Sequence, residues 1–210
     1  MKLRITSLLL LIACVAAVPA AAQLLYTNGP VNGTVDSWTI NFGFTVSDSF
    51  VLSSASTVTG FNFNTFSFPG DVLETVDVSI TSSEFGGTTY SNQVVNFTMS
   101  NCSANQFGFN VCLQSSTNFK PVNLDAGTYW LNLQNAVVND GDPIYWDENS
   151  GPSLASESSI GTIPSESFTL FGTTGTSTTS STSTTPEPSS VMLWGSGIIG
   201  LAGAIRRKLF

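Results

Sequence analysis

The sequence predicts an all-β protein whose central part folds as an antiparallel β-sandwich or jelly-roll-like domain. Apolar and polar residues alternate with period two through most of residues 23–172, as in strands with one buried face and one wet face. Helical spacing is absent from this interval. Turn sequences such as Asn28-Gly29-Pro30 and Pro69-Gly70-Asp71 interrupt the alternation. About eight to ten short strands in a domain of this length suit a sandwich.

Residues 1–22 are predicted to be a cleaved signal peptide. Lys2 and Arg4 form a positive n-region, and a short apolar run and a stretch of small residues follow. The positions expected to define the cleavage site are Ala20, Ala22 and Gln23. An uncleaved anchor is disfavoured because the apolar run is short for a bilayer. A lipoprotein signal at Cys14 is disfavoured because the chain stays apolar after it.

The predicted core consists of apolar residues at alternate positions of each strand. The sets are Trp38, Ile40, Phe42, Phe44 and Val46; Val72, Val76, Val78 and Ile80; Val95, Phe97 and Met99; Phe107, Phe109, Val111 and Leu113; Tyr129, Leu131 and Leu133; and Phe168 and Leu170. The acids Asp71, Glu74 and Asp77 are assigned to exposed strand and turn positions. The segment 124–133 resembles the strand entry L-x-A-G-T-Y of exported β-sandwich domains, among them carbohydrate-binding and cell-surface modules.

Cys102 and Cys112 are the two cysteines that remain after removal of the signal peptide. They flank predicted strands, and an even pair in an exported protein is expected to form a disulfide across the hairpin loop. In the chain-entropy model such a bridge contributes about 2–3 kcal/mol. Two free thiols and a two-cysteine metal site are the alternatives that this context disfavours.

The charge of the central part is strongly negative. Residues 23–188 hold all fourteen acids of the chain and one base, Lys120, which gives a formal charge of −13. Such a surface repels nucleic acid and anionic lipid, so no nucleic-acid partner is predicted. It suits a secreted protein that has to stay soluble, and it suits divalent cations.

The chain has no histidine. Its absence excludes Ser-His-Asp and Cys-His catalytic devices and the commonest zinc and copper sites. A carboxylate pair of the kind used in glycoside hydrolysis stays open, but no spacing singles out such a pair. We therefore predict that the protein is not an enzyme and requires no cofactor.

The best candidate for a binding site is the loop 139–151, which holds four acids and two adjacent aromatic residues. Carboxylate oxygens on a glycine-containing turn suit calcium, and aromatic faces beside acids and amides suit a sugar. The order of acids is not that of an EF-hand, and the alternative is a solvated acidic turn with one aromatic ring packed in the core. The candidate calcium ligands are Asp140, Asp142, Asp147 and Glu148. The candidate sugar contacts are Tyr145 and Trp146.

Two low-complexity or apolar segments follow the domain. Residues 173–185 contain only Thr, Ser and Gly, so we expect a disordered linker that is either a bare spacer or O-glycosylated.

Residues 191–205 carry no charge and predict one transmembrane helix. A helix of this length covers about 22 Å, less than the roughly 30 Å of the hydrocarbon core, so its flanks have to help it span. The basic residues expected on the cytoplasmic side are Arg206, Arg207 and Lys208.

The tail 186–210 resembles the PEP-CTERM sorting signal of exported bacterial proteins. The resemblance lies in Pro186, Glu187 and Pro188, the glycine-rich apolar segment and the basic end. It implies recognition by an exosortase, a membrane-embedded cysteine transpeptidase that would cut near these residues. The same segment is also similar to an ice-binding-protein C-terminal motif. That motif describes the tail alone, and ice binding is not predicted because the Thr-rich region lacks a regular Thr-x-Thr ladder.

These features together predict an exported protein that is held in the membrane by its C-terminal helix and then reaches the cell surface or the extracellular matrix. The expected role is structural or adhesive, in exopolysaccharide or biofilm. The alternative is a carbohydrate-binding, lectin-like module, with or without calcium.

Overall fold

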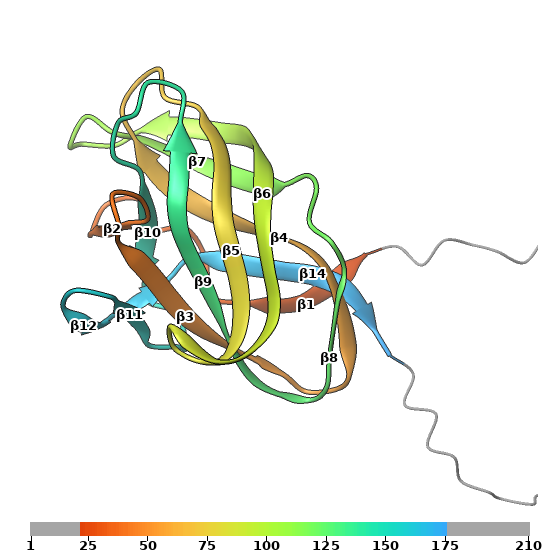
Figure 1. The fold of residues 1–210 in the computed structure, drawn as a ribbon. Helices are drawn as coiled ribbons and strands as arrows, with labels where there is room; N and C mark the ends of the chain where they lie inside the picture. The colour runs from red at the N-terminus through yellow and green to blue at the C-terminus, as the bar shows by residue number, and fades with distance from the viewer. Residues whose placement is uncertain (1–21, 176–210) are drawn as a thin grey trace, which may run out of the picture. The chain divides into compact units, whose positions relative to one another are not determined.

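The computed structural model describes residues 22–175, and this part of the chain is all-β, as the alternation predicts (Figure 1). The predicted signal peptide, most of the predicted linker, the PEP-CTERM-like tail and the predicted C-terminal helix lie outside the described residues. The linker begins later than predicted, because Thr173 and Thr174 still pair with Thr57 and Ser56. No helix among residues 22–175 is long and apolar enough to cross a membrane.

The strands are β1 (Gln23–Thr27), β2 (Ser37–Thr39), β3 (Thr45–Leu52), β4 (Ser56–Ser67), β5 (Leu73–Ser83), β6 (Gly86–Ala104), β7 (Asn110–Ser116), β8 (Val122–Leu124), β9 (Gly127–Val138), β10 (Tyr145–Asn149), β11 (Ala155–Glu157), β12 (Gly161–Ile163), β13 (Ser165–Glu166) and β14 (Phe168–Thr174). They form one curled antiparallel sheet in the order β1-β14-β4-β7-β6-β5-β9-β3-β11-β12. The short strands β2 and β13 attach through β10, which also pairs with β4, and β8 pairs with β4.

Strand β6 joins the two halves of the curled sheet. It is 19 residues long; its first part pairs with β5 and its last part pairs with β7. The half β1-β14-β4-β7 therefore continues into the half β5-β9-β3-β11-β12 without an edge between them. This continuity, together with the right-handed twist of strands, lets the sheet fold over its own apolar face.

The enclosed face forms one apolar core. Trp146 is the largest fully buried side chain, and its ring packs edge-on against Phe63 and Phe168 at centroid distances of 5.9 and 5.7 Å. Its indole N–H donates to the Ser167 carbonyl at 2.9 Å, which satisfies the polar end of the ring. The alternation correctly predicts eleven residues of this core: Ile40, Val46, Val76, Val78, Ile80, Val95, Tyr129, Leu131, Leu133, Phe168 and Leu170. The predicted residue Val111 is buried as well.

Residues 38–46 do not form the single strand that their spacing predicts. β2 ends at Thr39 and β3 starts at Thr45, and the chain reverses between them. Phe42 has φ 56 and Gly43 has φ 88, and the N–H of Phe44 donates to the Asn41 carbonyl at 3.1 Å. Phe42 and Phe44 are therefore exposed. A turn can mimic strand alternation when its apolar residues happen to keep an even spacing.

Val72 is exposed, whereas its neighbour Leu73 is buried. The pairing of β5 with β9 shifts between Leu73 and Thr75 and again between Thr75 and Asp77. Each bulge inserts a residue, so side chains before it and after it no longer follow one alternation. The prediction was wrong here because a bulge leaves no mark in the hydrophobic pattern.

The set from Phe107 to Leu113 also faces a different way from the prediction. Phe107 lies outside the strands and is exposed, and the inward positions of β7 belong to Cys112 and Gln114. Gln114 is tolerated inside because its amide donates to the buried Thr65 hydroxyl at 3.0 Å. Cys112 is buried, and it forms the predicted disulfide with the exposed Cys102, with a Cα–Cα distance of 4.2 Å.

Replacing Phe63 by alanine is expected to cost about 3–5 kcal/mol of unfolding free energy, because the ring is fully buried among other aromatic rings. The control is Phe42→Ala, which removes an exposed ring and is expected to change stability by less than about 0.5 kcal/mol. Equilibrium denaturation with urea measures both. An equal loss in the two variants would contradict the exposed turn at residues 41–44.

Candidate functional site

The loop predicted as the binding site is divided by the start of strand β10. Residues 139–144 form a turn and an extended segment, and Tyr145–Asn149 is the strand itself. Asp147 and Glu148 lie within this strand and are buried, whereas Asp140 and Asp142 precede it and group with a different acid. The predicted calcium set therefore does not come together as one group.

Asp140 and Asp142 instead lie beside Asp71, and ligand oxygens of the three carboxylates lie within 4.8 Å of one another. We call these residues the surface acid group. Asp140 is exposed, Asp142 is partly exposed and Asp71 is buried. Asp71 closes the turn after β4, because its Oδ2 accepts the N–H of Phe68 at 2.8 Å. Burial raises the pKa of Asp71, and the nearby charges of Asp140 and Asp142 raise it further.

The prediction that Asp71 is an exposed turn residue was wrong, and the reason is local. Asp71 lies in the turn Phe68-Pro69-Gly70-Asp71, where Gly70 has φ 107 and the Asp71 N–H donates to the Phe68 carbonyl at 3.1 Å. An Asp that caps a turn in this way binds its own backbone. The turn sequence was visible, but its proximity to Asp140 depends on pairing between β5 and β9, which sequence spacing does not give.

A row of aromatic rings lies beside the surface acid group. Phe68 and Phe109 have ring centroids 5.0 Å apart, and Phe109 and Tyr145 are 5.9 Å apart at 78°. Phe68 is 38% exposed, so one end of this row reaches solvent. Burial raises the pKa of Tyr145, and the charge of Asp142 raises it further, which places the phenol near the acids. Oxygen ligands for a cation and ring faces for a sugar thus lie together.

Trp146 is not part of this surface. Its side chain is fully buried in the core, because it points to the opposite face of β10 from Asp147. The alternative in which one of the two adjacent aromatic rings packs in the core is therefore the one that the structure supports. Tyr145 is the ring of the pair that stays partly exposed.

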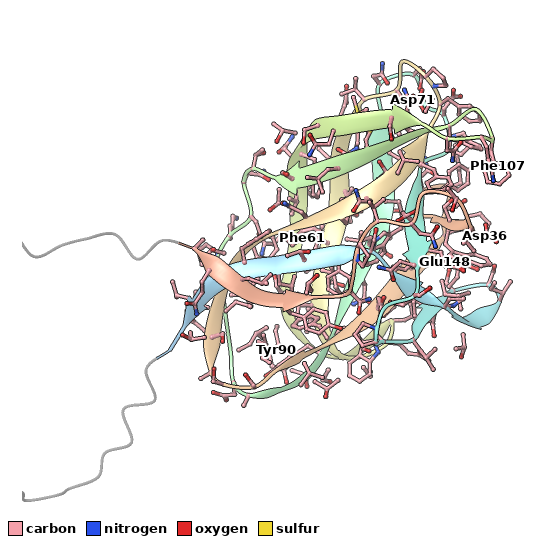
Figure 2. The ribbon with its side chains drawn as sticks, turned by 180° about the vertical axis from the view of Figure 1, so that it is seen from behind. Asp36, Phe61, Asp71, Tyr90, Phe107 and Glu148 are labelled. Carbon is pink, nitrogen blue, oxygen red and sulfur yellow. A yellow bond between two sulfur atoms is a disulfide. The ribbon has the colours of Figure 1, made fainter. Side chains whose placement is uncertain are left out.

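Asp147 is buried and holds the loop that precedes β2. Its two carboxylate oxygens accept the backbone N–H of Asn32 at 2.9 Å and of Gly33 at 2.7 Å. Burial raises the pKa of Asp147, although these two hydrogen bonds oppose the shift. Glu148 is also buried, and its Oε2 accepts the indole N–H of Trp38 at 3.0 Å. Neither acid joins Asp140 and Asp142, as Figure 2 illustrates by the separation of Glu148 from Asp71.

An uncharged cleft of about 390 Å³ lies beside the same loop. Its apolar floor includes Val111 and Leu113, and most of its rim consists of amides and hydroxyls. The polar lining residues are Asn32, Thr34, Asn64, Asn101, Ser103 and Asn105. Amides in a shallow cleft match the hydrogen-bonding groups of a sugar. No sequence pattern predicted this cleft, because its lining comes from four separate segments.

Comparison with known proteins adds no relative to this description. No protein-family model matches the chain, and a search of curated proteins finds no significant match.

Asp147→Ala is expected to lower the free energy of unfolding by about 1–3 kcal/mol, because the partly buried N–H of Asn32 and the buried N–H of Gly33 lose their acceptor. The matched control is Asp125→Ala, since Asp125 is exposed. Denaturant titration gives the two stabilities. Hydrogen exchange gives a second readout, in which the Asn32 and Gly33 amides exchange faster in Asp147→Ala alone. Unchanged protection of both amides would contradict this role.

Proposed function

We propose that the protein is exported and has a structural or adhesive role at the cell surface or in extracellular polysaccharide. The observation that carries the proposal is the Cys102–Cys112 disulfide in an all-β domain. Disulfides persist in oxidising compartments, so the bridge favours a location outside the cytoplasm. The predicted signal peptide and the PEP-CTERM-like tail supply a route that agrees with it.

The exposed side of the long strand β6 supports an adhesive role. Most of its 19 residues are exposed, and polar side chains predominate among them. The exposed residues with hydroxyl or amide side chains include Thr88, Thr89, Asn92, Asn96, Thr98, Ser100, Asn101 and Ser103. A row of hydroxyls and amides can exchange hydrogen bonds with the hydroxyls of a polysaccharide over many weak contacts. Charge contributes little to such binding, so we expect it to depend weakly on salt.

Sorting is tested with the full chain expressed in a bacterium that has an exosortase. We expect the unaltered chain in the surface and matrix fractions, in a form shortened at its C-terminus. Replacing Pro186, Glu187 and Pro188 by alanine removes the proposed recognition motif, so a full-length form is expected to accumulate in the membrane. Immunoblots of the fractions measure both. The same distribution for both chains, or in a host without an exosortase, would contradict exosortase sorting.

A second candidate function is calcium-dependent carbohydrate binding. The specific observation in its favour is that the surface acid group lies beside the aromatic row of Phe68, Phe109 and Tyr145. Burial raises the pKa of Asp71, and repulsion from Asp140 and Asp142 raises it further; calcium bridged between these carboxylates and sugar hydroxyls would relieve that repulsion. The exposed ring of Phe68 would supply an apolar contact for the sugar ring.

A glycan array with calcium and with chelator tests this second candidate. Asp140→Asn and Phe68→Ala are each expected to weaken selective binding more than tenfold, because one removes a cation ligand and the other removes the ring contact. Tyr90→Ala is the control, since this exposed tyrosine lies at the other end of the domain (Figure 2). Binding that survives chelation and both site substitutions would place any glycan contact elsewhere on the domain.

A further inference from the structure

A second group of acids lies inside the curled sheet, away from the surface acid group. Asp48 occupies an inward position of β3 between Val46 and Phe50, where the alternation calls for an apolar residue, and it is fully buried. Glu166 of β13 is fully buried as well, and Glu148 of β10 is 8% exposed. We call Asp48, Glu148 and Glu166 the buried acid group.

Of the three acids in this group, Glu166 has the fewest hydrogen-bond donors to its carboxylate. Neither of its carboxylate oxygens accepts a hydrogen bond from the described residues, although both are buried. Its direct cross-strand partner is Glu148, so the two side chains leave the same face of the β10–β13 pair. Like charges at directly opposite positions repel each other. Glu166 therefore points toward another acid rather than toward a donor.

Asp48 brings a third unpartnered oxygen to this region. Its Oδ2 accepts the backbone N–H of Glu166 at 2.7 Å and the side-chain N–H of Asn28 at 2.7 Å, which fixes it next to β13. Its Oδ1 is buried and has no hydrogen-bond donor among the described residues. Burial raises the pKa of Asp48 to about 6. Burial also raises the pKa of Glu166 well above its usual range, and the charge of Asp48 adds to the shift.

Acceptors outnumber donors around this group. The side-chain nitrogen of Asn28 lies 2.7–2.8 Å from four oxygens, although an amide nitrogen carries two hydrogens. The four oxygens are Asp48 Oδ2, Ser153 Oγ, Ser165 Oγ and the Glu166 carbonyl. Lys120, the one base among residues 22–175, is exposed and its backbone contacts Gln93. No side chain among residues 22–175 therefore supplies positive charge to the buried acid group.

We propose that the buried acid group binds a calcium ion, with Glu166, Asp48 and Glu148 as its carboxylate ligands. Hard oxygen donors select calcium over transition metals, and hydroxyl and carbonyl oxygens nearby can complete a coordination number of about 6–8. The chain has no histidine, and Cys102 and Cys112 are bonded to each other. A cation here satisfies the unpartnered oxygens of Glu166 and Asp48, which apolar packing cannot do.

Glu148 is the ligand that has to move. Among residues 22–175 the surface acid group is the one set of three acids whose ligand oxygens all lie within 4.8 Å, so the buried acid group has to contract around the ion. Glu148 is the least buried of its three members, and it lies beside the partly exposed Trp38. Ion entry and the contraction are therefore expected on the Trp38 side.

Terbium, a luminescent substitute for calcium, tests the proposal on the full chain in a mild non-ionic detergent. Trp38 donates to Glu148 at 3.0 Å, so indole excitation is expected to give terbium emission that calcium displaces. Glu166→Gln is expected to weaken this binding more than tenfold, and Asp125→Asn, which changes an exposed acid outside both acid groups, is expected to leave it unchanged. Glu148→Gln, at the rim, gives the same test if Glu166→Gln does not fold.

Thermal unfolding shows whether a bound cation or bound protons neutralise the charge of the buried acid group. If calcium binds, it raises the melting temperature of the unaltered chain and of Asp125→Asn, but not that of Glu166→Gln. The proposal is overturned if calcium leaves the melting temperature of the unaltered chain unchanged and Glu166→Gln is more stable on its own. That result would show Glu166 to be a neutral acid. If Asp140→Asn loses glycan binding but keeps terbium binding, the result bears on the surface acid group and not on the buried acid group.

Discussion

The shortage of basic residues is the constraint on which much of this structure depends. Among residues 22–175 Lys120 is the one base, so buried acids have to rely on N–H and O–H donors. Glu157 shows that this can succeed: burial raises its pKa, but hydrogen bonds from Ser159 and Ser158 outweigh burial and lower it. Asp147 gains two backbone donors and thereby fixes a loop. Glu166 accepts no hydrogen bond through its carboxylate from any described residue. The number of nearby hydrogen-bond donors therefore decides which acids can stay charged without an ion.

The fold class followed from the sequence because alternation reports which face of a strand is buried. It succeeded where strands are regular, as in β9, where Tyr129, Leu131 and Leu133 all point inward. It failed at the turn around Phe42 and at the bulges before Asp77, because both change side-chain direction without changing the apolar spacing. The sharing of β6 between the two halves could not be predicted either, because local alternation does not indicate which distant strands pair.

The candidate sites show the same limit more sharply. The sequence grouped Asp140, Asp142, Asp147 and Glu148 because they are close along the chain, and the onset of β10 sends them to two different places. The partners that complete each place come from distant segments: Asp71 on the surface, and Asp48 and Glu166 inside. A cluster of acids can be predicted from sequence only when one loop supplies every member, as in an EF-hand. In this protein, pairing between strands brings the acids of each cluster together.

The neighbouring positions of the first and last strands have a mechanical consequence. β14 lies between β1 and β4 and is hydrogen bonded to both, with Gln23 opposite Gly172 (Figure 1). Tension applied to the chain beyond Thr174 would run along β14 and load these two ladders in shear, so many hydrogen bonds would resist together instead of opening one at a time. A force on the C-terminal side of the domain would thus act on a strand that is hydrogen bonded on both sides. β1 would add resistance by clamping β14 on its outer side.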